Sequence, residues 1–180
     1  MSCCTFCGNS LPDIKSWPHQ CVLCGKFLYN SPKPVVALVI PAYSPNSNTT
    51  RGLLIIKRGI EPYKGVWAFP GGYIDYQESW QNAAVREARE EIGVELDPKH
   101  LRLDRIETTP NNYIVFFVRA YLDVGDKGWT THDITKNIND SGVQEILKIG
   151  LATDLIELGI PSHNRYMQDL DFRTLQLRSH

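Results

Sequence analysis

Short hydrophobic runs recur along most of the chain and predict a fold rich in β-strands. Each run is rich in β-branched or aromatic residues and is bounded by polar, Pro- or Gly-containing segments, as buried strands usually are. The runs are Val35–Ile40, Leu53–Ile56, Trp67–Phe69, Leu101–Glu107, Tyr113–Leu122 and Glu145–Ile149. We expect the first two to pair antiparallel across a polar loop at 44–50.

Three segments have helical patterns. The segment 79–92 has Ser79 at the N-cap position and Gly93 where a helix C-terminus prefers glycine. Shorter helices are expected at Thr153–Leu158 and at His163–Leu175, the second with Tyr166, Leu170 and Leu175 facing inward, whereas 123–141 is polar and turn-rich. Because strands outnumber helices and the helices lie between or after them, we expect an α+β fold with a mixed sheet between helices.

The first thirty residues have a different character and predict a separate small domain. All 5 cysteines of the chain lie between Cys3 and Cys24, and few other residues there could form an apolar core. Ser31-Pro32-Lys33-Pro34 follows, and two prolines in four residues favour an extended connector. We therefore expect one domain at 1–31 and a second at 35–180.

Composition excludes several classes of protein. A net charge of -1 argues against a protein whose main ligand is a nucleic acid backbone, although it leaves room for a local basic patch. No apolar run approaches the ~20 residues that span a bilayer. The N-terminus lacks the apolar region of a secretory signal, so the expected compartment is the cytosol, where thiols stay reduced.

The cysteines form two Cys-x-x-Cys-Gly motifs that predict a zinc site. The first is Cys4-Thr-Phe-Cys7-Gly8 and the second is Cys21-Val-Leu-Cys24-Gly25, while Cys3 is left over. Four thiolates spaced in this way suit tetrahedral Zn²⁺ better than a disulfide or an iron–sulfur cluster. The pattern resembles a zinc ribbon. Its metal is expected to be structural, because a domain of some thirty residues rarely folds without a disulfide or a bound metal.

A second constellation lies on the expected helix at 79–92. Glu87, Glu90 and Glu91 stand at i, i+3 and i+4 and therefore share one face. Three neighbouring negative charges are stable on a solvated helix surface, where Arg86 and Arg89 would be their partners. They are also stable if they bind a cation, and Mg²⁺ and Mn²⁺ prefer carboxylate oxygens as ligands. The preceding Pro70-Gly71-Gly72 would let backbone carbonyls approach the same point, which favours the metal.

This segment resembles the Nudix box, G-x5-E-x7-R-E-U-x-E-E-x-G-U, where U is a bulky aliphatic residue. The matching positions are Gly72, Glu78, Arg86, Glu87, Glu90, Glu91, Gly93 and Val94, with Ala88 as a small residue at an aliphatic position. The resemblance extends in outline from about Val35 to about Ile149. It implies a Nudix-type α/β/α sandwich with a mixed sheet, preceded here by the zinc ribbon.

The resemblance also implies roles for these residues. Glu87, Glu90 and Glu91 resemble the ligands of Mg²⁺ or Mn²⁺, assisted by a backbone carbonyl of Gly71 or Gly72. Arg86 resembles the arginine that orients a catalytic glutamate, and Glu78 its salt-bridge partner. Such a site hydrolyses a diphosphate by activating water; Glu90, Glu91 or a loop glutamate such as Glu145 are alternatives for the general base.

The combination of a zinc ribbon with this box resembles NADH pyrophosphatases and enzymes acting on ADP-ribose or FAD. The NADH-specific array S-Q-P-W-P-F-P-x-S is absent at 106–113, and Pro110 falls sixteen residues after Val94, where ADP-ribose pyrophosphatases tend to carry a proline. Five aromatic residues could stack on an adenine, although each residue of this kind is more often part of a core. They are Tyr63, Phe69, Tyr73, Tyr113 and Phe116.

Other functions remain open on sequence alone. A non-catalytic Nudix module that senses a nucleotide would predict a degraded glutamate set, yet the set is intact. An enzyme that removes nucleotide caps from RNA would use the ribbon as a basic platform, yet the ribbon has only Lys15 and Lys26 as cations. A nucleotide triphosphatase is a further alternative, a homodimer is implied by the resemblance alone, and the five histidines receive no role.

Overall fold

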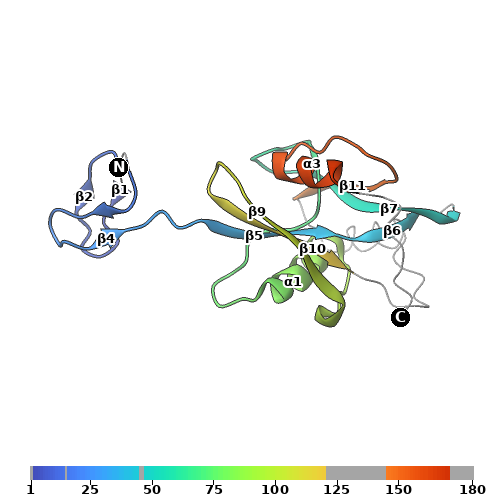
Figure 1. The fold of residues 1–180 in the computed structure, drawn as a ribbon, viewed down its shortest axis with the longest axis horizontal. Coiled ribbons are helices and arrows are strands. Elements are labelled where there is room, and N and C mark those ends of the chain that lie inside the picture. The colour runs from blue at the N-terminus through green and yellow to red at the C-terminus, as the bar shows by residue number, and fades with distance from the viewer. Residues whose placement is uncertain (1, 15, 45–46, 121–144, 171–180) are drawn as a thin grey trace. The chain divides into compact units, whose positions relative to one another are not determined.

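The computed structural model describes residues 2–14, 16–44, 47–120 and 145–170 (Figure 1). The chain divides into two compact units, Met1–Lys33 and Pro34–His180. The division falls inside the expected proline-containing connector, Ser31-Pro32-Lys33-Pro34.

The first unit consists of two small hairpins, each with one Cys pair at its turn. Its strands are β1 (Ser2–Cys3), β2 (Ser10–Leu11), β3 (His19–Gln20) and β4 (Phe27–Leu28); β1 pairs with β2 and β3 with β4, both antiparallel. The only fully buried apolar side chains among the described residues of this unit are Cys4, Leu11, Cys21 and Leu28. This core is too small to stabilise a domain without a further link between the hairpins.

The second unit contains two groups of strands. In one, the order is β5 (Lys33–Val39), β10 (Tyr113–Ala120) and β9 (Leu101–Thr108). The other is built around the long β7 (Ser47–Arg58), which pairs with β6 (Pro41–Ser44), β8 (Trp67–Ala68) and β11 (Ile146–Ala152). Only Ile40 separates β5 from β6, so one extended segment of chain contributes to both groups.

The strand pairing corrects one expectation. Val35–Ile40 meets Leu53–Ile56 only at its last residue, because the Ile40 carbonyl accepts from the Leu54 N–H; β5 itself lies beside β10, and β6, which follows it, pairs with β7 so that Pro41 is opposite Leu53. The expected loop at 44–50 is also wrong, because Ser44 and residues from Ser47 onward belong to β6 and β7. The stretch is polar but belongs to two paired strands, β6 and β7. Only residues 45–46 of it lie outside the described residues.

The helices are α1 (Trp80–Ile92), a 3₁₀ turn at Pro98–His100 and α3 (Pro161–Gln168). The caps of α1 are confirmed: the Ser79 hydroxyl accepts a hydrogen bond from the Asn82 N–H, and Gly93 has the left-handed φ of 64°. The inward-facing Tyr166 is buried, and Leu170 packs against the core. The last part of the expected helix, including Leu175, lies outside the described residues, as does 123–141.

The expected helix at Thr153–Leu158 is wrong. Residues 153–160 contain no helical turn, and their polar groups are satisfied by other parts of the unit. The Leu158 N–H donates to the Asn164 side-chain carbonyl, and the Gly159 N–H donates to the Trp67 carbonyl. These hydrogen bonds replace those of a helix and tie the segment to β8 and to α3.

Two apolar clusters flank the strands and confirm the α+β sandwich with its mixed sheet. Alternate residues of β5 and β7 face α1 on one side, with Leu38 and Ile56 as examples. The intervening residues, among them Val39 and Ile55, face α3. Figure 1 shows α1 and α3 on opposite sides of the strands. Within the described part of the chain, no helix is long and apolar enough to cross a membrane.

Candidate functional site

The site begins where β8 ends, at a tight corner formed by Pro70-Gly71-Gly72. The Pro70 carbonyl accepts a hydrogen bond from the Leu38 N–H at 2.8 Å, and the Gly72 carbonyl accepts one from the Val36 N–H at 2.9 Å. Gly71 has φ 140°, and a Cβ there would overlap the backbone carbonyl of Val36. The corner is therefore fixed to β5 in a conformation that only glycine adopts easily.

Two carboxylates of α1 are buried against this corner. The Gly71 N–H donates to Oε2 of Glu91 at 2.7 Å, and Glu91 is only 7% exposed. Its burial raises the pKa from 4.5 to about 8. A Cβ on Gly72 would overlap the carboxylate of Glu87, which is also buried and whose pKa is raised by burial despite the neighbouring Arg86. The two acids are thus short of compensating positive charge.

Arg86 joins the helix to the segment that follows the corner. Its guanidinium contacts both oxygens of Glu78, at 3.0 and 2.9 Å, and holds the pKa of that carboxyl below its ordinary value. It also donates to Glu87 at 2.7 Å, to Glu90 at 3.1 Å and to the Tyr73 carbonyl at 2.8 Å. A planar group with five donors suits this arrangement, so Arg86 orients the acids as well as pairing with them.

The donor set fits a hard divalent cation. Among the described residues, the acids do not converge on one point: Glu87 and Glu90 share Arg86, and Glu91 accepts from Gly71. Nevertheless, Glu87 and Glu91 are both desolvated, and they lie beside a corner that has no room for a side chain. A bound Mg²⁺ or Mn²⁺ would lower the free-energy cost of burying their charges. Glu90 is more exposed than Glu87 and Glu91, with 53% of its side chain accessible to solvent.

Two further charged residues act on the site. The charge of Glu145, directly before β11, contributes to the raised pKa of both Glu87 and Glu91. Arg58, at the end of β7, acts in the opposite direction on the pKa of Glu91. The sequence pattern identified Glu145 as a candidate but missed Arg58, because nothing in its local context distinguishes it from an ordinary charged strand end.

The five aromatic candidates lie in different environments. Phe69 is a correction: it is 2% exposed and packs edge-on against Phe117 and Tyr166, so its ring belongs to the core and cannot contact a ligand. Phe116 is half-buried against the cluster beneath α1. Tyr63 is 37% exposed in the loop before β8.

Tyr73 directly follows the glycine corner and pairs with Tyr113. Their hydroxyls are 3.3 Å apart, their ring centroids are 6.2 Å apart, and Tyr73 is 51% exposed. Its hydrogen bond with Tyr113 raises the pKa of Tyr73 above its ordinary value. The exposed Tyr73 ring, backed by the half-buried Tyr113, is available to stack on a planar group.

The four cysteines of the two motifs come together in the first unit. The Sγ atoms of Cys4 and Cys24 are 3.7 Å apart, those of Cys7 and Cys21 are 3.8 Å apart, and all four lie within 4.8 Å of one another. Four sulfurs placed tetrahedrally at ~2.3 Å from a zinc ion would be ~3.8 Å apart. The geometry therefore fits a Cys₄ zinc site, whereas Cys3 is exposed and outside the group.

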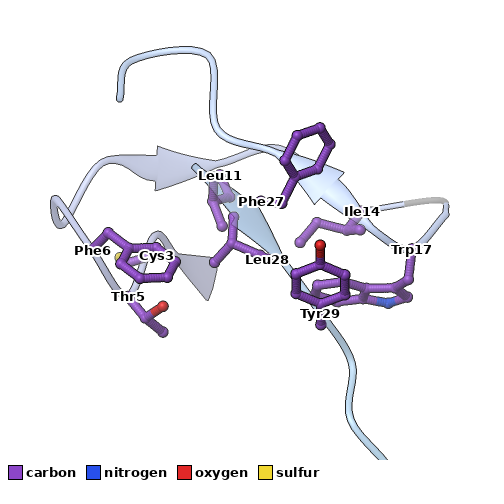
Figure 2. A pocket seen from close by; sticks show the side chains of 9 residues that line it. All are labelled: Cys3, Thr5, Phe6, Leu11, Ile14, Trp17, Phe27, Leu28 and Tyr29. Carbon is purple, nitrogen blue, oxygen red and sulfur yellow. The ribbon is translucent and has the colours of Figure 1, made fainter. Parts of the chain in front are cut away.

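The first unit also has a small apolar cavity of about 340 Å³. Figure 2 shows its lining side chains, four of them aromatic, gathered around Leu11 and Leu28. The full lining is Cys3, Thr5, Phe6, Leu11, Ile14, Trp17, Phe27, Leu28 and Tyr29. It contains no charged side chain and none of the four converging cysteines, so it is distinct in character from both metal sites.

Comparison with known proteins gives the following matches. The family model described as NUDIX domain matches residues 32–145, more than half of the chain. An ADP-ribose pyrophosphatase from Methanocaldococcus jannaschii is 41% identical over 59 residues, which cover 33% of this chain and 34% of the relative. The NAD-capped RNA hydrolase NudC from Pseudomonas aeruginosa is 30% identical over 96 residues, which cover 51% of this chain and 31% of the relative.

Among solved structures, a NUDIX hydrolase from Nitrosomonas europaea aligns with a TM-score of 0.52 and 22% identity, covering 100% of this chain and 97% of that chain. This likeness concerns the fold. The present chain spans about a third of the length of the two curated relatives, so the similarity is to a part of each.

Proposed function

The chain belongs to the NUDIX family, and we propose that it is a hydrolase that uses a divalent cation to cleave the phosphoanhydride bond of a nucleoside diphosphate linked to another group. The observation that carries the proposal is the pair of buried acids, Glu87 and Glu91, packed against Gly71 and Gly72. A solvated acidic surface would not bury these side chains or raise their pKa values.

Glu87, Glu90 and Glu91 would hold Mg²⁺ or Mn²⁺, with a carbonyl of the glycine corner as a further oxygen ligand. The Gly72 carbonyl already accepts from Val36, which favours Gly71 for this part. When bound, the cation neutralises charge on the phosphate oxygens and lowers the pKa of an attacking water.

The residues of the chain supply orientation and a base. Arg86, held by Glu78, keeps Glu87 and Glu90 on one side of the corner. A general base must be an acid within reach of the attacking water, and Glu90, Glu91 and Glu145 all belong to the same cluster of charges. Glu91 accepts the Gly71 N–H and Glu90 accepts from Arg86, each through one carboxylate oxygen, so hydrogen bonding does not favour one of them as the base.

We propose a substrate of the ADP-ribose, FAD or NADH type, cleaved to release a nucleoside monophosphate. The match to an ADP-ribose pyrophosphatase over 59 residues supports this class of substrate. The exposed ring of Tyr73, supported by the half-buried Tyr113, offers a surface on which an adenine can stack, and Tyr63 is a second candidate.

A second candidate is hydrolysis of a nicotinamide-type cap on RNA, which the match to NudC favours. Both candidates use the same bond and the same acids; they differ in what is attached beyond the second phosphate. In either case we propose that residues 1–31 are a zinc ribbon with Zn²⁺ on Cys4, Cys7, Cys21 and Cys24, which requires a reducing compartment such as the cytosol.

The test is a substrate screen of the purified, zinc-loaded chain with Mg²⁺ and with Mn²⁺. Release of AMP is measured from ADP-ribose, FAD, NADH and an RNA capped with NAD, beside ATP as a triphosphate control. We expect turnover of at least one dinucleotide-type substrate and none in Glu91→Gln. Turnover that persists in Glu91→Gln, or that needs no divalent cation, would remove the proposal.

The aromatic pair has its own test within the screen. Tyr73→Ala is expected to raise KM for the preferred substrate about tenfold with little change in kcat, because stacking on a base contributes ~1–3 kcal/mol. Tyr76→Ala serves as the matched control, since Tyr76 is 91% exposed. Equal KM values for the two variants would contradict the role of Tyr73 in binding.

A further inference from the structure

His163 is buried in the second unit and makes a contact that ordinary packing does not require. It lies in the first turn of α3, is 8% exposed, and its Nδ1 accepts a hydrogen bond from the Phe69 N–H at 3.1 Å. Burial, with a smaller effect of Arg58, lowers the pKa of His163 to about 3. The ring is therefore neutral, and its proton resides on Nε2 while Nδ1 accepts.

The ring is held rigidly in place. Its centroid lies 5.5 Å from that of Phe69 and 5.8 Å from that of Phe117, so two aromatic rings pack against the buried imidazole. Because such a ring has little rotational freedom, its Nδ1 defines the position of the Phe69 N–H.

His163 is one of two contacts that satisfy the outer edge of β8. In a strand, the polar groups of residues i and i+2 point to the same side, so the Trp67 carbonyl and the Phe69 N–H share an edge. Ala68 pairs with Ile56 of β7 on the other edge. The Gly159 N–H donates to the Trp67 carbonyl at 3.0 Å, and His163 accepts from Phe69. The start of α3 thus replaces a missing neighbouring strand.

Phe69 leads directly into the glycine corner. Pro70 separates it from Gly71, whose N–H donates to Glu91, and both Pro70 and Gly72 are hydrogen-bonded to β5. Each backbone position from Phe69 to Gly72 is therefore hydrogen-bonded to another element: Phe69 to α3, Pro70 and Gly72 to β5, and Gly71 to α1. Releasing the Phe69 N–H removes the contact that fixes the direction in which the chain enters the corner.

We propose that His163 is a positioning residue for the active site: by accepting the Phe69 N–H, it fixes the strand end that presents the Gly71 N–H to Glu91. The inference rests on the proposed function only in treating Glu91 as a ligand of the catalytic cation. It concerns a residue outside the Nudix box, about seventy positions along the chain from Glu91.

The experiment compares His163→Asn with His163→Leu in the full, zinc-loaded chain. Asparagine places a carbonyl oxygen near the position of Nδ1 and can accept the Phe69 N–H; leucine fills similar space but cannot accept. Mn²⁺ affinity is measured by electron paramagnetic resonance, and exchange of the Gly71 amide proton by nuclear magnetic resonance. We expect His163→Leu to weaken Mn²⁺ binding about tenfold, as loss of an outer partner usually does, and His163→Asn to stay within about twofold of the parent.

Met167→Val is the control for a general loosening of α3, because Met167 is fully buried on the same helix and packs without hydrogen bonding its side chain to β8. It is expected to lower the melting temperature but to leave Mn²⁺ affinity and Gly71 exchange near those of the parent. If Met167→Val weakens Mn²⁺ binding as much as His163→Leu does, the positioning role is overturned.

Two outcomes need separate treatment. If His163→Leu does not fold, His163→Gln takes its place as the variant that cannot accept from Phe69, because the glutamine carbonyl lies one bond farther from the backbone than Nδ1. Equal Mn²⁺ affinities of His163→Asn and His163→Gln would then overturn the proposal. If the parent protein binds no Mn²⁺, the proposed function fails, and the exchange of the Gly71 amide still decides the role of His163: unchanged exchange in His163→Leu, or in His163→Gln, overturns it.

Discussion

Replacing Glu91 by glutamine is expected to make the cation-free protein more stable while it abolishes hydrolysis. Glu91 is 7% exposed, its one hydrogen bond among the described contacts comes from the Gly71 N–H, and its pKa is raised to about 8 by burial. Glutamine keeps an oxygen that can accept from Gly71 but carries no charge. At pH 7 the folded Glu91 carboxyl has to take up a proton, which the neutral amide does not, so the substitution removes this cost without removing the contact.

The size of the effect follows from proton linkage. The carboxyl has a pKa of 4.5 when unfolded and about 8 when folded, so the folded chain binds the extra proton between these pH values. A raised pKa contributes no penalty below about pH 4.5, and the free energy of unfolding then falls as the pH rises toward 8. At ~1.4 kcal/mol per pH unit, the raised pKa lowers the free energy of unfolding by about 3 kcal/mol at pH 7. We expect Glu91→Gln to recover about 2 kcal/mol of this, because the glutamine N–H₂ group must find hydrogen-bond partners of its own.

The assay is calorimetric melting of the second unit with zinc retained and other divalent cations omitted. A gain of about 2 kcal/mol corresponds to ~4–8 °C for a unit of this size. The difference between variant and parent should shrink as the pH is lowered toward 4.5. His163 has a lowered pKa, so its own contribution is present above about pH 6.5 and lost as the pH falls toward about 3, but it cancels in this difference.

Glu95→Gln is the matched control, because Glu95 is exposed just beyond α1. Mn²⁺ should raise the melting temperature of the parent and of Glu95→Gln, but not of Glu91→Gln. The reasoning is refuted if Glu91→Gln is no more stable than the parent at pH 7, or if its advantage is the same at every pH.

Three other substitutions test the arrangement around the acids and the cysteines. Arg86→Lys is expected to lower kcat by about a hundredfold with the fold intact, because one ammonium group cannot replace the planar contacts to Glu78, Glu87 and the Tyr73 carbonyl; steady-state kinetics with circular dichroism measures this. Gly72→Ala should weaken Mn²⁺ binding at least tenfold, since the added Cβ displaces the Glu87 carboxylate, and unchanged affinity would contradict that close approach. Cys7→Ser should abolish the single bound zinc measured by mass spectrometry whereas Cys3→Ser keeps it, and equal zinc contents would refute the Cys₄ assignment.

The part of the fold that could be predicted from sequence is the part determined by local signals. Ser79 and Gly93 delimit α1 because capping is a contact between neighbours in the chain, and the spacing of Glu87 and Glu91 follows from helical geometry alone. Each cysteine pair lies at the turn of its own hairpin, which is why the position of each pair could be predicted from its local motif.

The errors occurred where distant partners decide the structure. The polar stretch at 44–50 forms strand because β6 pairs with β7, a contact that no local pattern reveals. Residues 153–158 are not helical because Gly159 and Asn164 redirect the backbone toward β8 and α3. Phe69 was one of five aromatic candidates for stacking on an adenine, and its burial depends on the distant Tyr166 of α3.

His163 is a residue that a closer examination of periodicity could have indicated. His163, Tyr166, Met167 and Leu170 stand at i, i+3, i+4 and i+7, which places them on one face of α3. The burial of that face would have followed from Tyr166 and Met167. Its partner, the Phe69 N–H, could not have been inferred, because it depends on which edge of β8 is left without a neighbouring strand.

The contacts of Arg86 have a consequence for whether the second unit stays folded when no divalent cation is bound. One guanidinium already neutralises part of the charge on Glu78, Glu87 and Glu90 and binds the loop through the Tyr73 carbonyl. The second unit therefore carries an internal counter-ion of its own, whereas the proposed zinc site of the first unit consists of four thiol side chains. On the proposed assignments, depletion of magnesium would leave the second unit folded but inactive, whereas depletion of zinc would unfold the first unit.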